Sequence, residues 1–157
     1  MANFDDIKKA NESINPMNIK GKDYAPVNER IKAFRMVYPN GTILTEIVKD
    51  DDVKIIMKAT IYGDKELLAT GTAEEVRGSS NINRTSALEN CETSAVGRAL
   101  GLAGFGIDTS VASYEEVENA KLRAEGAKLA TSTEKAGFIA SANAKGLDYH
   151  EILERVG

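Results

Sequence analysis

The sequence has one cysteine, one histidine and no long apolar run, and each of these shortages excludes a class of protein. Cys91, being alone, excludes an intramolecular disulfide and fits a reducing compartment such as the cytoplasm. His150 has no cluster of cysteines or carboxylates near it at metal-ligand spacing, so we expect neither a zinc site nor a catalytic histidine. No apolar run is long enough to span a membrane, and residues 1–20 are too polar for a signal peptide.

The motifs of bond-making chemistry are absent as well. The sequence contains no GxxxxGK(S/T) phosphate loop, no GxGxxG after a strand and no partner set for a catalytic serine. Cys91 falls on an apolar helical face, where packing is more typical than nucleophilic work. The sequence therefore predicts a protein that is not an enzyme and that uses no cofactor.

The charge balance limits the choice of partners. With 24 acidic and 20 basic residues the formal net charge is −4. Phosphate backbones bind to basic surfaces, so this charge argues against a nucleic-acid-binding surface that covers the whole protein. Only a local basic patch could bind nucleic acid.

The middle of the chain predicts an α+β fold. A helix capped by Asn28 is expected to run to Tyr38. Three strands follow, at residues 42–48, 53–62 and 67–76. The second strand alternates strictly along its length, which is typical of a strand with one buried face. We expect a three-stranded antiparallel meander whose apolar face is covered by a long helix that starts at Ser86.

The long helix has two features of its own. Ser86 and Glu89 stand at the spacing of a capping box. A second stripe has almost no side chains, although an interior glycine costs a helix roughly 1 kcal/mol relative to alanine. The stripe consists of Ser94, Gly97, Gly101 and Gly104. Something must lie close against it: the tightly packed core, a phosphate chain or a neighbouring subunit.

Three parts are expected along the chain. Residues 1–112 form the core together with an N-terminal arm, whose short amphipathic segment we expect to dock loosely. Residues 113–130 form a connecting helix with C-terminal helices after it. Residues 131–133 break that helix, and residues 134–157 form a small helical hairpin.

Two local patterns lie at the ends of the long helix. Residues 77–84 are small and polar and include two arginines, so we expect a mobile surface loop before the helix. Ser113 and Glu116 repeat the spacing of a capping box and are expected to open the connecting helix.

The segment TSAVGRALGLAG, at residues 93–104 behind the meander, resembles the core of phage single-strand annealing recombinases of the Sak, Erf and Red-beta types. The resemblance implies ATP-independent binding of single-stranded DNA and annealing of complementary strands in recombination and DNA repair. It also implies a ring or filament homo-oligomer in the cytoplasm of a bacteriophage host. A host single-strand-binding protein is an expected partner of the C-terminal region. Arg98 matches the basic residue of the family's helix motif.

Binding of single strands needs cations along a groove and exposed faces on which bases can stack. If DNA runs between sheet and helix, the candidate DNA-binding residues are Lys54, Lys58, Tyr62, Arg77, Arg84 and Arg98. Arg98 could instead be structural, paired with Glu92 or Glu89. Two other functions remain open: an accessory protein that binds single-stranded DNA without annealing it, and a protein-interaction or inhibitor module.

Overall fold

The computed structural model describes residues 3–144 and confirms the α+β class. Residues up to Lys121 form one compact unit, and residues from Leu122 onward belong to a second unit. The elements, in chain order, are α1 (Phe4–Asn11), β1 (Met17–Ile19), β2 (Lys22–Tyr24), α2 (Val27–Val37), β3 (Thr42–Asp50), β4 (Lys54–Gly63), β5 (Glu66–Val76), α3 (Asn81–Thr85), α4 (Ala87–Leu102) and α5 (Tyr114–Ala144).

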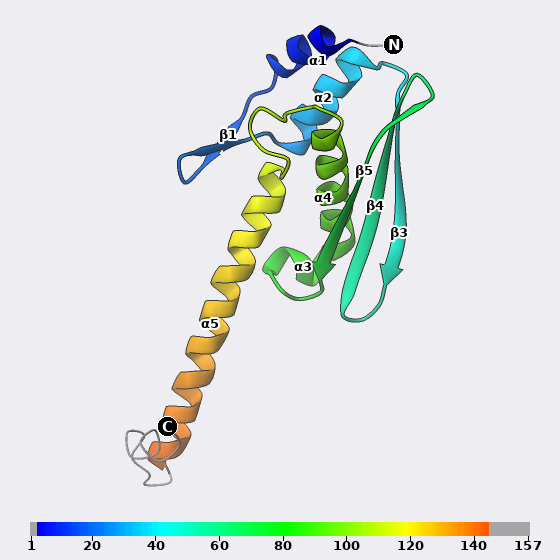
Figure 1. Ribbon diagram of the computed structural model, residues 1–157. Coiled ribbons are helices and arrows are strands. Elements are labelled where there is room, and N and C mark those ends of the chain that lie inside the picture. Colours follow the sequence, from blue (N-terminus) through cyan, green and yellow to red (C-terminus); the bar gives the residue numbers. More distant parts are fainter. Residues whose placement is uncertain (1–2, 145–157) are drawn as a thin grey trace, which may run out of the picture. The chain divides into compact units, whose positions relative to one another are not determined.

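The predicted meander is present as an antiparallel sheet in the order β3-β4-β5 (Figure 1). Its central strand β4 buries every second residue, namely Ile55, Met57, Ala59 and Ile61. Lys54, Lys58 and Tyr62 stand on the opposite face, which none of the helices in the first unit covers. The strict alternation of the sequence therefore determined which face of the sheet is buried.

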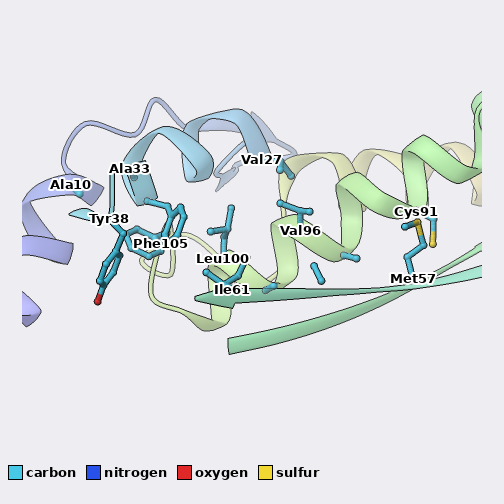
Figure 2. Close-up of a cluster of buried hydrophobic side chains, with 14 of the residues drawn as sticks. Ala10, Val27, Ala33, Tyr38, Met57, Ile61, Cys91, Val96, Leu100 and Phe105 are labelled. Atoms are coloured by element: carbon cyan, nitrogen blue, oxygen red, sulfur yellow. The ribbon is translucent and has the colours of Figure 1, made fainter. Parts of the chain in front are cut away.

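Helix α4 packs across the buried face of the sheet, where Figure 2 shows Cys91 beside Met57. Ala95 and Ala99 of the same helix lie against Gly71 of β5. The contact is close enough to need glycine on the sheet, because a Cβ at Gly71 would lie 2.5 Å from the backbone nitrogen of Ala99. The thiol of Cys91 lies 3.5 Å from the carbonyl oxygen of Ile55. Small residues on both sides thus let helix and sheet approach to backbone contact.

An aromatic cluster closes one end of this core. Phe34 of α2 lies between Tyr38 and Phe105, with ring centroids 5.6 and 5.5 Å away. The Phe34 and Phe105 rings meet edge to face at 84°, an arrangement that aromatic pairs favour. Figure 2 shows Tyr38 and Phe105 beside Leu100, at the end of α4. The cluster joins α2 to the sheet and helix.

The N-terminal arm is docked more firmly than the sequence indicated. The side chain of Asn11 donates a hydrogen bond to the carbonyl oxygen of Gly104 at 2.9 Å and accepts one from the amide of Gly106 at 3.0 Å. Ala10 is buried in the core. The arm continues into a small hairpin of β1 and β2, whose turn places Lys20 and Gly21 in the left-handed region.

Two expectations about helix starts were wrong. Helix α2 begins at Val27, before the expected cap at Asn28, and the carboxylate of Glu115 accepts from the Val27 amide at 3.1 Å. Ser86 forms no side-chain cap on α4. Its amide bonds to the carbonyl oxygen of Ile82, so its backbone is held by the end of α3 instead.

The second capping box is confirmed, and the predicted helix break is not. The Ser113 amide donates to the Glu116 carboxylate at 2.9 Å, and the Glu116 amide donates to the Ser113 hydroxyl at 3.3 Å. Helix α5 continues through residues 131–133, where we expected a break. The rest of the predicted C-terminal hairpin, residues 145–157, lies outside the described residues.

Candidate functional site

The two predicted lysines of the sheet are both ion-paired across strands. Lys54 lies 2.7 Å from the carboxylate of Glu74 on β5, and Lys58 lies 3.4 Å from that of Glu46 on β3. The Glu74 pair raises the pKa of Lys54 through its hydrogen bond and its charge. Each of the two lysines therefore already has an anion beside it.

The three predicted arginines lie on other surfaces. Arg77 binds the Asp50 carboxylate and the Asp51 carbonyl, where β5 ends beside the β3–β4 turn. Arg98 of α4 binds Glu116 of α5 at 2.7 Å, so the expected structural pairing is present with a different glutamate. Arg84 of α3 donates to the side-chain oxygen of Asn81 and forms no ion pair within residues 3–144.

These six residues do not line one groove. The space between sheet and helix, where we expected DNA to run, is the packed core itself. Lys54, Lys58 and Tyr62 lie on the face of the sheet that points away from α4. The proposed groove was therefore wrong, because alternation along β4 places its lysines opposite the buried face.

A chain of buried amides holds the segment before α4, which we expected to be a mobile loop. Asn83 is nearly inaccessible and donates to the carboxylate of Glu75, itself buried on β5. Asn90 of α4 donates to Asn83 at 2.8 Å, and Asn119 of α5 donates to Asn90 at 2.6 Å. Four elements therefore meet in one polar network, and the segment forms the short helix α3.

The stripe of small residues on α4 is filled by the same chain. Its main occupant is Arg30 of α2, whose guanidinium is completely buried and which sequence reasoning missed. A Cβ at Gly101 would overlap Nη1 of Arg30, and a Cβ at Gly97 would lie 2.6 Å from Val27. Of the three occupants left open by the sequence, the packed core is the one present.

Backbone carbonyl groups accept from both terminal nitrogens of the buried Arg30 guanidinium, whereas its Nε has no hydrogen-bond partner within residues 3–144. Nη1 donates to Gly97 at 2.8 Å and to Val111 at 2.9 Å, and Nη2 donates to Ser110 at 2.6 Å and to Ala112 at 3.0 Å. Burial lowers the pKa of Arg30, and Glu116 and Glu115 oppose that shift. Arg30 thus fastens the segment before α5 to helices α2 and α4.

The cations that remain unpaired are concentrated near the N-terminus. Residues 1–40 hold seven basic and five acidic residues, whereas residues 41–121 hold eight basic and fourteen acidic ones. Six exposed cations of the first segment form no ion pair within the part of the chain that the structure describes; we call them the N-terminal cations. They are Lys8 and Lys9 on α1, Lys20 and Lys22 on the β1–β2 hairpin, and Lys32 and Arg35 on α2.

Tyr62 lines an open pocket at the end of the sheet. The pocket has a volume of about 400 Å³. Its lining residues come from the α2–β3 turn and the β4–β5 turn: Asn40, Gly41, Thr42, Tyr62, Asp64 and Lys65. A smaller pocket of about 150 Å³ lies beside it, lined by Tyr38, Gly63, Asp64 and Glu66. Burial, together with Asp64 and Glu66, raises the pKa of Tyr38.

The described residues contain neither a metal-binding cluster nor a membrane-spanning helix. Within residues 3–144 no group of three or more histidine, cysteine, aspartate or glutamate side chains could hold a metal ion. No helix in that range is long and apolar enough to cross a membrane.

The family model described as Slr1353 N-terminal dsRNA-binding domain-like matches residues 31–103. This range runs from α2 through the meander to the end of α4, and it covers slightly less than half of the 157 residues. No curated protein and no solved structure matches the chain. The assignment to the phage single-strand annealing recombinases was therefore wrong, because the matching model describes a different kind of domain over the same helix and sheet.

Proposed function

We propose that this chain is a nucleic-acid-binding module and not an enzyme, and that double-stranded RNA is the first ligand to test. The observation that carries the proposal is the match over residues 31–103 to a model described as dsRNA-binding domain-like. The matched range contains most of α2, the whole meander and α4, which share one core. The match therefore extends over the sheet as well as the helix that packs on it.

Duplex RNA is recognised mainly through its shape, its phosphates and its 2′-hydroxyl groups. A protein that binds it needs unpaired cations, and the N-terminal cations are the largest such group in the described residues. The cations of the sheet are neutralised by glutamates on neighbouring strands. We therefore assign phosphate binding to α1, the β1–β2 hairpin and α2.

The acidic surplus of residues 41–121 fits this assignment. An uneven distribution of charge over a protein orients an approaching polyanion. A net-acidic protein can therefore bind a phosphate backbone through one local surface. The acidic remainder would weaken binding in any other orientation.

Several finer expectations are separate from this proposal. Strand annealing and phage recombination were implied by the discarded resemblance alone, so they are not part of the proposed function. A homo-oligomer would multiply a modest basic surface, but the glycine stripe is occupied and no longer offers its interface. A host single-strand-binding protein as partner of the C-terminal region, and the cytoplasm as location, stay predictions.

The test is direct binding of labelled nucleic acids to the full chain. Fluorescence anisotropy with duplex RNA, duplex DNA, single-stranded RNA and single-stranded DNA should show binding to duplex RNA that weakens linearly in log–log plots against salt. Binding to single-stranded DNA alone would favour the accessory single-strand-binding function. Absence of binding to all four would favour the protein-interaction module instead.

A further inference from the structure

The pocket at the end of the sheet combines an aromatic ring with polar and charged groups. Tyr62 is the only aromatic residue on strands β3, β4 and β5. It lies on the open face, directly opposite Thr42 on one neighbouring strand and Leu67 on the other. Backbone pairing on both sides holds its position, so the ring is offered on a rigid part of the fold.

Apolar side chains extend the surface around this ring. Leu67 is 60% exposed, and Leu44, which is paired with Thr60 on the same face, is 48% exposed. No residue of β3, β4 or β5 other than Tyr62 offers a π-face here. The combination of one aromatic ring and two aliphatic neighbours suits a flat, partly apolar group.

The β4–β5 turn contributes the cation Lys65, whose backbone conformation is strained. Asp64 and Lys65 both have positive φ, 48° and 76°. Hairpin turns of this kind prefer glycine at the second position, because an L side chain is strained in the left-handed region. A glycine at position 65 would adopt this backbone conformation with less strain. Lys65 forms no ion pair within residues 3–144 and lines the pocket. Strained positions of this kind cluster at functional sites, which makes Lys65 a candidate ligand-binding group.

The remaining lining groups can hydrogen-bond a ligand. Asn40 has an amide that both donates and accepts, Thr42 has a hydroxyl, and Asp64 has a carboxylate. The volume of about 400 Å³ falls within the range of about 300–1,000 Å³ typical of small-ligand pockets. A nucleotide needs these features: a surface for the base, polar groups for its edge and a cation for its phosphate.

We infer that this pocket binds one unpaired nucleotide at the end of a nucleic acid, with the base stacked on Tyr62 and its phosphate beside Lys65. The inference rests on the proposed function and adds a preference for ends that carry an overhang. Figure 1 places the β4–β5 turn at the same end of the first unit as α1 and α2, which carry four of the N-terminal cations. A duplex bound to those cations can therefore present its end to the pocket.

The experiment compares blunt duplex RNA with the same duplex carrying a one-nucleotide overhang, placed on the 5′ or the 3′ side in separate probes. The overhanging base is 2-aminopurine, whose fluorescence reports stacking. The parent protein should bind one of the overhang probes about 5- to 150-fold more tightly than the blunt duplex, which is the range for one stacked base.

Tyr62→Phe should keep this preference, and Tyr62→Leu should lose it without changing the salt dependence of binding. Tyr114→Leu, at another partly buried tyrosine that lies outside the assigned phosphate-binding elements, should behave like the parent.

Lys65→Gly supplies a second test, because a lysine without a role in binding would leave the affinity for the overhang probe unchanged. Relief of the left-handed strain should raise the melting temperature, while loss of the ammonium group should weaken binding of the overhang probe and leave blunt binding unchanged. Because this variant should fold better than the parent, it also decides the matter if Tyr62→Leu fails to fold. Equal binding of blunt and overhang probes by the parent overturns the inference and leaves the proposed function standing. Absence of binding to either probe overturns both.

Discussion

Nη1 of Arg30 donates a hydrogen bond of 2.8 Å to the carbonyl oxygen of Gly97, 67 residues further along the chain. The contact explains why α4 carries glycine on the side that faces α2. A side chain at Gly101 would occupy the space of the guanidinium itself. The buried guanidinium of Arg30 therefore packs directly against the glycine stripe of α4.

Replacing Arg30 by alanine should destabilise the first unit severely. The change leaves the buried carbonyl group of Gly97 and the partly buried carbonyl groups of residues 110–112 without these donors. Hydrogen bonds to a charged group contribute about 1.5–3 kcal/mol each. We expect a loss of at least about 3 kcal/mol in the free energy of unfolding, measured in urea. Lys32→Ala, on the exposed side of the same helix, is the control and should stay within about 0.5 kcal/mol of the parent. Similar losses in both variants would contradict the buried role of Arg30.

Gly101→Ala tests the same packing from the side of α4. The added methyl group would meet Arg30 and, at 2.9 Å, the carbonyl oxygen of Val111, and overpacking of this kind costs about 1–3 kcal/mol. That cost outweighs the gain of roughly 1 kcal/mol from replacing glycine by alanine in a helix. We therefore expect a lower melting temperature. The matched change Gly137→Ala, where no atom lies within 4 Å, should not lower it. If Gly101→Ala melted as high as the parent, the stripe would not be packed.

The sequence predicted contacts between residues that are close along the chain and missed contacts between residues that are far apart along it. The alternation along residues 53–62 is local, and it identified both strand and buried face correctly. Capping boxes share one spacing, yet the Ser113 box forms and the Ser86 box does not, because the end of α3 already holds Ser86. No local pattern marks Arg30, whose acceptors lie 67–82 residues away.

The ion pairs of the candidate site residues could not be predicted for a similar reason. Lys54 and Lys58 look like free cations when read along β4, but their glutamate partners lie on the two neighbouring strands. Only the strand register reveals them: Glu46 stands directly opposite Lys58. The glycine stripe was the one signal that could have led to Arg30, since it required an occupant.

The thiol of Cys91 should react slowly while the protein is folded. Burial raises its pKa, so little thiolate is present near neutral pH. Because the unfolded thiol loses its proton at a lower pH than the folded one, its contribution to stability is present below about pH 8.5 and declines as the pH rises above that value. Stability measured from pH 7.5 to 9.5 should fall less in Cys91→Ala than in the parent. Identical pH profiles, or rapid thiol labelling of the native protein at pH 7, would show that the thiol is not shielded.

Arg98→Ala should have a small effect on stability and none on the salt dependence of nucleic-acid binding. The ion pair with Glu116 is partly exposed, with the arginine side chain 44% accessible, and such pairs contribute at most about 1 kcal/mol. Glu116 already neutralises the guanidinium, so no phosphate contact is lost. Thermal melts and salt titrations of binding check both parts. A flatter salt dependence in Arg98→Ala would return this arginine to the binding surface.

The central claim is that phosphates bind the N-terminal cations and not the paired cations of the sheet. Two charge-matched variants separate these surfaces. One changes Lys8, Lys9, Lys20 and Lys22 to glutamine. The other changes four ion-paired cations to glutamine, which lowers the net charge by the same amount. They are Lys49, Lys54, Lys58 and Arg77.

The deciding measurement is the slope of log affinity for duplex RNA against log salt concentration in both variants and the parent. Each phosphate contact contributes about 0.9 to this slope for a DNA duplex, and we expect a similar value here. The account predicts that the N-terminal variant flattens the slope by at least about one unit, while the sheet variant keeps the parent slope. An unchanged slope in the N-terminal variant, or equal flattening in both, would contradict it.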